Sequence, residues 1–426
     1  MRVLQISNGN FFSTYGGGQV YVKNIVDEMI QQQLDIVIFS FVNEARKATI
    51  TKKDYEGIGL YELFNTTKTE IKELIRAIAP DLIHAHAQKD LFAEISKELS
   101  IPYIVTAHHG GIVDPAGTLM TYKDEIRKEP ISHESSLPDV LNNIRCGLLF
   151  FPILKQIPLK WRLAIGRFLQ KLPFIYFVTS IGKANLIIER KMQKWKIIRE
   201  NTNLIIAPSF AIADSLMQNG LLKEKTQVIP HGIPTETRIG NIVPVDITGR
   251  KVKFFYVGRV CYVKGIHVLL EAFIQLPPSS CELHLIGGGD KKYINELKKK
   301  YGSKTNIFFH GIINPNEVLV ATRNFDVLIH PTICLEVFGL NIAEALSEGK
   351  PVIATRCGGA EMQITDKENG LLVPPNSVTD LHQVMDWVLN NPDKVRQMSI
   401  NAPLRVISIK EHVRKLQEIY KIQLRR

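Results

Sequence analysis

The chain has 426 residues, of which 45% are hydrophobic and 22% are charged, and its formal net charge is +11. This balance excludes a largely disordered chain, and the length predicts two domains, since a domain usually holds about 100–200 residues. The five cysteines are scattered and form no C-x-x-C pair, which excludes a disulfide framework. The first residues predict a strand rather than a signal peptide, so we expect a cytoplasmic protein.

Short apolar runs alternate with helical patterns along the first half of the chain. Helices are expected at 19–33 and 69–78, between runs that are rich in β-branched residues. This alternation predicts a parallel sheet built from βαβ units. The strands expected in the first half are 3–7, 35–40, 81–85, 103–107, 203–207 and 227–229.

A long insertion interrupts this series at about 112–200. Some 95 residues separate the strand that ends near Ala107 from the strand at 203, whereas connections between strands and helices are usually far shorter. We therefore expect the insertion to be helical and functional.

Most of the net positive charge lies in this insertion. Residues 151–200 hold eleven Lys or Arg and two Glu, together with several aromatic residues. The longest uncharged stretch, 172–182, is too short for a membrane-spanning helix, which needs about 20 residues. The composition favours contact with an anionic membrane surface. The alternative is a solvated basic face of ordinary helices, and no nucleic-acid partner is expected because no such motif accompanies the charge.

The second half repeats the alternation of strands and helices. Residues 231–250 are rich in turn formers and lack a periodic pattern, which predicts a domain boundary there. We expect an N-terminal domain at 1–235, a C-terminal domain at 236–410 and a final helix at 411–426. The fold class is therefore α/β, with two doubly wound domains and a ligand site in the cleft between them. The strands expected in the second half are 253–257, 282–286, 306–309, 327–330, 352–355 and 371–373.

Gly16, Gly17 and Gly18 follow the first expected strand and precede a helix. Backbone N–H groups at such a junction can approach a phosphate or an acceptor closely, because glycine has no side chain. The pattern is not G-x-G-x-x-G, and no acidic residue ends the second strand, so NAD binding is disfavoured. A flexible turn is the alternative interpretation.

Arg259 and Lys264 follow the first strand of the second domain and stand beside glycines. Two cations at this spacing can hold a diphosphate, although an exposed pair of loop residues is the alternative. Farther along, Glu336 lies in a loop after a strand, and Glu344 lies on a helix that begins near Gly339. Two carboxylates about this far apart could hold two hydroxyl-bearing rings, with a diphosphate at the helix N-terminus between them.

His108 and His109 follow a strand at 103–107, where imidazole groups could donate hydrogen bonds to substrate oxygens. His84 and His86 stand at the end of the preceding strand in the same way. The sequence has no zinc motif and no Asp-x-Asp, so no metal site is expected. It also lacks G-x-S-x-G, which argues against a serine nucleophile.

Taken together, these motifs resemble the retaining glycosyltransferases of the GT-B architecture, in the family 4 or group 1 type. The resemblance covers almost the whole chain except 112–200, and one departure is that Glu361 stands one residue before the usual position, which Met362 occupies. The motifs that carry it are Gly16-Gly17, Asp81 to His86, Thr106 to His108, Ala207 to Ser209, Val228 to Ile233, Gly258 to Gly265, Gly287 to Gly289, Glu336 to Glu344, Gly349 to Thr355, Gly358-Gly359 and Gly370 to Pro375.

This resemblance implies a role for each matching residue. Arg259 and Lys264 neutralise the donor diphosphate, Glu336 holds sugar hydroxyls, and Glu344 holds the ribose of the nucleotide. His108 contacts the transferred sugar and is assigned with Glu336 to catalysis, while Gly17 brings its backbone to a phosphate. The remaining assignments are Gly339, Leu340 and Ile313 to donor binding, and Gly16 and His109 to the acceptor side.

The implied reaction is metal-independent sugar transfer, with retention, from a nucleotide-diphosphate sugar to a saccharide or lipid-linked acceptor. No cofactor is implied, and the helix at 411–426 is expected to cross back to the first domain. We expect work in cell-surface polysaccharide or glycolipid synthesis, at the inner face of the membrane. Two alternatives remain open: a sugar-nucleotide epimerase of the same fold, and a catalytically dead binding protein at the membrane.

Overall fold

The computed structural model describes residues 1–9, 16–42, 47–144, 146–169, 176–234, 242–314 and 317–425, with the backbone alone at 176–179. The chain forms two compact units, one of Met1–Pro230 with Val413–Arg426 and one of His231–His412. Each unit is built on one mainly parallel sheet, which confirms the predicted α/β class.

The first unit contains an eight-stranded sheet of order β3-β4-β2-β1-β5-β6-β7-β8 among the described residues. Neighbouring strands are parallel, except for the antiparallel pair β3–β4. The short strands β5, β6 and β7 are buried along their whole length, as expected for strands that helices cover on both faces. The strands are β1 (Arg2–Asn8), β2 (Asp35–Phe41), β3 (Thr49–Tyr55), β4 (Ile58–Phe64), β5 (Leu82–Ala85), β6 (Tyr103–Thr106), β7 (Leu204–Ala207) and β8 (Thr226–Val228).

The hairpin β3–β4 at the edge of this sheet is absent from the predicted strands. Most residues of β3 are exposed, and the strand carries the polar run Lys52, Lys53 and Asp54, so it lacks the apolar pattern of the other strands. Its two-residue turn of Glu56 and Gly57 has positive φ at both positions, the geometry that suits a tight hairpin.

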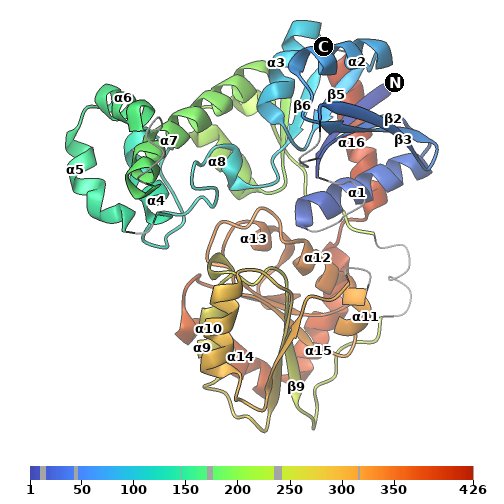
Figure 1. Ribbon diagram of the computed structural model, residues 1–426. Helices are drawn as coiled ribbons and strands as arrows, with labels where there is room; N and C mark the ends of the chain where they lie inside the picture. Colours follow the sequence, from blue (N-terminus) through green and yellow to red (C-terminus); the bar gives the residue numbers. More distant parts are fainter. Residues whose placement is uncertain are drawn as a thin grey trace. The chain divides into compact units, whose positions relative to one another are not determined.

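Side chains cap the first turns of α2, α4 and α8 in the first unit. At α2, the Thr67 side chain accepts a hydrogen bond from the backbone N–H of Glu70, whose carboxylate accepts one from the backbone N–H of Thr67. The apolar residues of α2 recur at three- and four-residue spacing and face the core. The helices of this unit outside the insertion are α1 (Gly17–Gln31), α2 (Lys68–Ile78), α3 (Lys89–Leu99), α8 (Phe210–Gln218) and α16 (Ile409–Leu424), the last drawn in red in Figure 1.

The helix α16 belongs to the first unit from Val413 onward, although the second unit precedes it in the chain. Its buried face consists of Val413, Leu416, Ile419 and Tyr420, which are at most 3% exposed. Leu424, expected on the same stripe, is 38% exposed because the helix ends there. The crossing of the chain back to the first domain, predicted from the sequence, is thus confirmed.

The insertion forms a group of helices, drawn in green in Figure 1. Leu137 and Leu141 of α4 pack with Ile181 and Ile188 of α7 in a separate apolar cluster. The helix α7 also packs along α3 and so joins the insertion to the sheet. The helices are α4 (His133–Asn142), α5 (Phe151–Gln156), α6 (Leu159–Leu169) and α7 (Tyr176–Asn201).

The second unit contains a six-stranded parallel sheet of order β11-β10-β9-β12-β13-β14 among the described residues. Its strands are β9 (Val252–Val257), β10 (Cys281–Ile286), β11 (Ile307–Gly311), β12 (Val327–His330), β13 (Val352–Thr355) and β14 (Gly370–Val373). Its helices are α9 (Ile266–Phe273), α10 (Lys291–Tyr301), α11 (Val318–Thr322), α12 (Leu340–Ser347), α13 (Gly359–Gln363), α14 (Val378–Asn390) and α15 (Pro392–Asn401).

The boundary between the units differs from the predicted one by a few residues. The predicted boundary at 235–236 lies outside the described residues, while His231 already belongs to the second unit. The reason is backbone pairing, because Ile233 donates to Ile407 and accepts from Ile409. These bonds tie the start of the second unit to the segment that leads into α16.

Candidate functional site

A chain of hydrogen bonds lies beneath His108 in the first unit. His108 Nε2 is 2.8 Å from Nδ1 of His86, whose Nε2 is 3.0 Å from Oε1 of Gln5. Gln5 Nε2 donates to the Tyr420 hydroxyl at 3.2 Å, and that hydroxyl lies 2.7 Å from Nδ1 of His84. The helix α16 therefore contributes a side chain to the polar interior behind the candidate catalytic histidine.

These partners fix the tautomers of the histidines. The amide oxygen of Gln5 can only accept, so His86 donates from Nε2 and, as a neutral ring, accepts at Nδ1. His108 must then donate from Nε2 to His86. The other ring nitrogen of His108, Nδ1, is buried in this structure.

A cavity of about 450 Å³ in the first unit brings several predicted residues together. Gly16 and Gly17 at the start of α1 line it, as do His108 and His109 after β6. A Cβ placed on Gly18 would lie 3.7 Å from the His108 side chain, so the ring stands directly beside the beginning of the helix. The N-terminal glycines and both histidines thus share one site.

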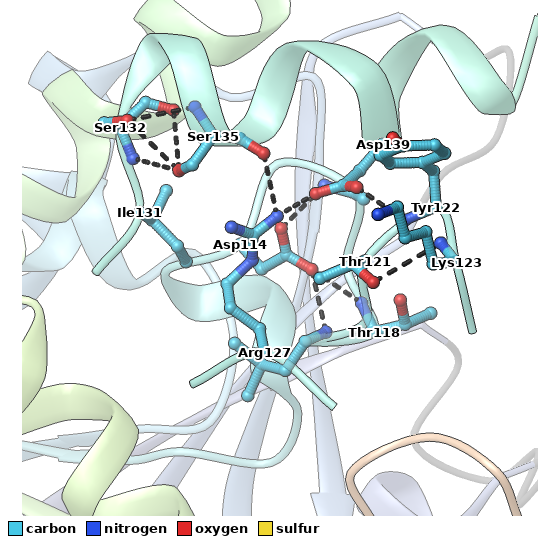
Figure 2. A network of polar contacts seen from close by, with 12 residues as sticks. Asp114, Thr118, Thr121, Tyr122, Lys123, Arg127, Ile131, Ser132, Ser135 and Asp139 are labelled. Carbon is cyan, nitrogen blue, oxygen red and sulfur yellow. Dashed lines mark hydrogen bonds and ion pairs between the residues drawn. The ribbon is translucent and has the colours of Figure 1, made fainter. Parts of the chain in front are cut away.

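The loop after β6 forms one wall of this cavity, and a polar network holds it. Asp114 accepts hydrogen bonds from the backbone of Thr118 and Leu119, and Asp139 of α4 accepts one from Tyr122 at 2.7 Å. Figure 2 shows the guanidinium of Arg127 directed toward Asp139, with which it forms a buried ion pair. The insertion therefore fixes the loop that carries the cavity wall.

In the second unit, three charged or polar side chains converge beyond the ends of β9 and β12. Lys264 forms an ion pair with the carboxylate of Glu336, and His330 Nε2 lies 3.2 Å from the same carboxylate. All three side chains are largely buried, with His330 only 4% exposed. The structure thus joins two residues that the sequence assigned to separate contacts, diphosphate and sugar.

These contacts set the charge of the cluster. Burial alone would raise the pKa of Glu336, but the ammonium of Lys264 and the His330 ring outweigh it and lower that pKa well below the usual range. Burial opposes the charge of Lys264 as well, yet Glu336 raises the Lys264 pKa above its ordinary value. Glu336 is therefore a carboxylate at neutral pH and can accept hydrogen bonds from hydroxyl groups.

Tight backbone packing explains the glycines around Lys264. Gly265 has φ +68°, and a Cβ there would lie 1.9 Å from the carbonyl oxygen of Pro331. A Cβ on Gly287 would lie at the same distance from the Gly258 carbonyl. Glycine at these positions lets the loops after β9, β10 and β12 approach one another and holds Lys264 beside Glu336.

The helix α12 begins next to this cluster. Gly339 precedes it with φ +83°, Leu340 is its first residue, and Glu344 lies half-buried one turn farther along. Asn341 Nδ2 donates to the carbonyl of Val257 at 2.8 Å, so the first turn of α12 adjoins the carboxyl end of β9. Glu336 in the loop and Glu344 on the helix thus occupy the predicted elements.

Arg259 and Ile313 lie elsewhere around the sheet edge. Arg259 is exposed, and no carboxylate of the described residues lies within ion-pair distance of its guanidinium. Ile313 is half-buried and packs against the core beside α12. Glu361, which departs from the usual position, accepts a hydrogen bond from the Gly358 backbone at 3.0 Å and so caps α13.

The described residues contain neither a metal-binding cluster nor a membrane-spanning helix. No group of three His, Cys, Asp or Glu side chains is arranged to hold a metal ion there. Likewise, no helix within those ranges is long and apolar enough to cross a membrane.

Two family models match different parts of the chain. The model of glycosyl transferases group 1 matches residues 242–405, and that of glycosyl transferase 4-like proteins matches residues 12–127. The chain is a group 1 glycosyltransferase. Together the two matches include nearly all of the candidate residues of this glycosyltransferase.

The chain is similar to individual relatives and to solved structures. The glycosyltransferase is 21% identical to O-antigen chain mannosyltransferase C of Escherichia coli over 95% of its own length and 93% of that protein. It is 25% identical to the D-rhamnosyltransferase WbpZ of Pseudomonas aeruginosa over 54% of its length, and the match spans only 65% of WbpZ. Anabaena HepE in complex with UDP superimposes with a TM-score of 0.68 at 17% identity, over 99% of this chain and all of that one.

Sequence reasoning missed several residues of the glycosyltransferase site. His330 was identified only as the end of a strand, and Lys89, Lys191 and Lys194 of the cavity were not singled out. Lys191 and Lys194 are three residues apart on α7, which places them on one helix face, but nothing in the sequence shows that this face meets α3. The basic residues of 151–200 thus do not form one solvated surface, since Arg162 is also buried against Glu134.

Proposed function

We propose that this glycosyltransferase moves a sugar from a nucleoside-diphosphate sugar to a hydroxyl group of a saccharide or lipid-linked acceptor. The observation that carries the proposal is the cluster of Lys264, Glu336 and His330 beside the first turn of α12. It combines an ammonium group for a diphosphate with an ionised carboxylate for sugar hydroxyls. HepE, which shares the fold, has been solved with UDP and with UDP-glucose.

The reaction we propose proceeds with retention and without a metal ion. The bond between the anomeric carbon and the donor phosphate oxygen breaks, and a bond to the acceptor oxygen forms on the same face. The acceptor proton passes to the leaving phosphate oxygen, and the nucleoside diphosphate departs. Arg259 and Lys264 would neutralise its negative charge, which supplies the electrostatic stabilisation that such a transfer needs.

The remaining residues would position the substrates. Glu344 would bind the ribose, and Gly339, Leu340 and Ile313 would contact the donor. In the first unit, His108 would contact the transferred sugar, while Gly17 would bring its backbone N–H to a phosphate. Gly16 and His109 would adjoin the acceptor.

A second part of the proposal concerns the membrane. On α6, Trp161, Ile165 and Phe168 recur at four- and three-residue spacing and are all exposed. Lys160 and Arg167 on the same helix are exposed as well, so the chemistry of α6 fits an anionic lipid surface at the inner face of a membrane. Equal binding to vesicles with and without anionic lipid would contradict this part.

The test of the transferase proposal is calorimetric titration of the full chain with UDP, GDP and ADP, each with and without EDTA. We expect one nucleotide to bind, EDTA to have no effect, and Lys264→Met to weaken binding at least about tenfold. Glu336→Gln should abolish transfer and retain nucleotide binding. If Glu336→Gln turns over at the wild-type rate, Glu336 has no catalytic role. If the wild type converts the donor sugar without releasing nucleotide, the chain is an epimerase and not a transferase.

A further inference from the structure

Lysine side chains from two elements meet in the cavity of the first unit. Lys89 stands at the start of α3, and Lys191 and Lys194 stand on the insertion helix α7. All three line the same cavity as Gly17 and His108. The insertion therefore supplies part of the wall of the pocket where the sugar would lie.

Among the described residues, no carboxylate forms an ion pair with two of these lysines. Lys89 Nζ donates to the carbonyl of His86 at 2.6 Å, and Lys191 Nζ donates to the carbonyl of Gly111 at 2.5 Å. A carbonyl satisfies one N–H group but brings no negative charge. Within the described ranges, Lys194 alone of the three has an ion pair, with Asp90 at 2.8 Å.

The neighbouring groups respond to this positive charge. Burial, and then the charge of Lys191, lower the pKa of Lys89 to about 8. Desolvation of the ring, followed by the charges of Lys89 and Lys191, lowers the pKa of His109 to about 4. Both shifts have the sign expected where cations crowd together, and a bound anion would relieve them.

The beginning of α1 adds to the same field. Its first turn contains no acidic residue, and no side chain of the described residues caps it at Gly16. The first backbone N–H groups of this 15-residue helix therefore point their partial positive charge toward the end of the cavity that the glycines line.

We propose that this cavity binds a phosphate group carried by the acceptor, held by Lys89 and Lys191 with Lys194 at its edge. The proposal rests on the transferase function proposed above and names the chemistry of its acceptor. A phosphate, with up to two negative charges, matches two ammonium groups better than a single carboxylate does. A volume of about 450 Å³ also leaves room for a sugar ring beside the phosphate.

The test is calorimetric titration of the full chain with glucose 1-phosphate, and with glucose as the neutral probe, both in the presence of UDP. Lys191→Met removes the charge and keeps the length of the side chain. Lys196→Met is the matched control, because Lys196 is exposed on the same helix and does not line the cavity. We expect Lys191→Met to weaken glucose 1-phosphate binding at least about tenfold, Lys191→Arg to restore it, and the control to leave it unchanged.

A second arm distinguishes a soluble phosphate from one carried by a lipid. Vesicles of phosphatidylcholine, with and without a polyprenyl phosphate, are offered to the same variants. The phosphate would be carried by a lipid if the wild type binds vesicles with polyprenyl phosphate more tightly than vesicles without it. Lys191→Met, and not Lys196→Met, should then lose this difference. The proposal fails if Lys191→Met behaves like Lys196→Met in both arms, or if glucose binds as tightly as its phosphate.

Titration with UDP alone separates this failure from failure of the transferase proposal. Suppose that Lys191→Met binds both UDP and glucose 1-phosphate as the wild type does. That result would overturn only the proposed site for the acceptor phosphate. If Lys264→Met binds UDP as tightly as the wild type does, the proposed donor site is overturned instead. Thermal unfolding of each variant checks that the chain has folded.

Discussion

Replacing Lys264 with methionine should leave the carboxylate of Glu336 as a poorly compensated buried charge. Removing one partner of a buried ion pair costs about 3–5 kcal/mol. The two side chains are 21% and 14% exposed, and His330 keeps its contact with the carboxylate. We therefore expect Lys264→Met to cost about 2–3 kcal/mol and Glu336→Gln about 1–2 kcal/mol.

The double variant decides whether this interpretation is right. With both charges gone, Lys264→Met with Glu336→Gln should cost only about 1–2 kcal/mol, which gives a coupling free energy of about 2 kcal/mol. Urea unfolding can be followed by the fluorescence of Trp387 in the second unit, after Trp161 and Trp195 are replaced by phenylalanine. A coupling below about 0.5 kcal/mol would refute the reasoning.

The pH dependence of the stability difference between the wild type and Lys264→Met gives an independent check. The folded-state pKa of Glu336 is lowered from its ordinary 4.5, so the stabilisation from its charge is present above about pH 4.5 and is lost as the pH falls. The difference in free energy of unfolding between the wild type and Lys264→Met should thus be constant near neutral pH and shrink below about pH 4.5. A gap that does not change with pH would show that methionine acts through packing alone.

Three further predictions concern stability. Tyr420→Phe should cost about 1–3 kcal/mol in urea unfolding, because it leaves the buried ring of His84 without the hydroxyl that bonds its Nδ1, and an unchanged midpoint would argue against the network. Lys89→Met should abolish the rise in wild-type stability between about pH 8 and 10.5, where the unfolded chain binds the extra proton, and thermal unfolding across that range measures it. Gly265→Ala should cost at least about 2 kcal/mol, since its Cβ would meet the Pro331 carbonyl, and a wild-type melting temperature would contradict the clash.

The sequence was enough for the fold because the strands alternate with helices and most are continuous apolar runs. The hairpin β3–β4 was not predicted because the polar edge strand β3 carries no such pattern. Glu336 and Glu344 were found from their spacing, since both positions lie on consecutive elements. The pairing of Lys264 with Glu336 joins residues 72 positions apart, and only the topology of the second sheet brings them together.

The position of α16 has a consequence for how the protein is made. Tyr420 completes the polar interior under His108, yet the ribosome reaches it only after the whole second unit has been synthesised. At about 5–20 residues per second, the first sheet exists for on the order of ten seconds or more before this helix emerges. During that interval Gln5 and His84 face an unfilled groove, which makes the nascent first unit the part of the chain most dependent on protection from premature association.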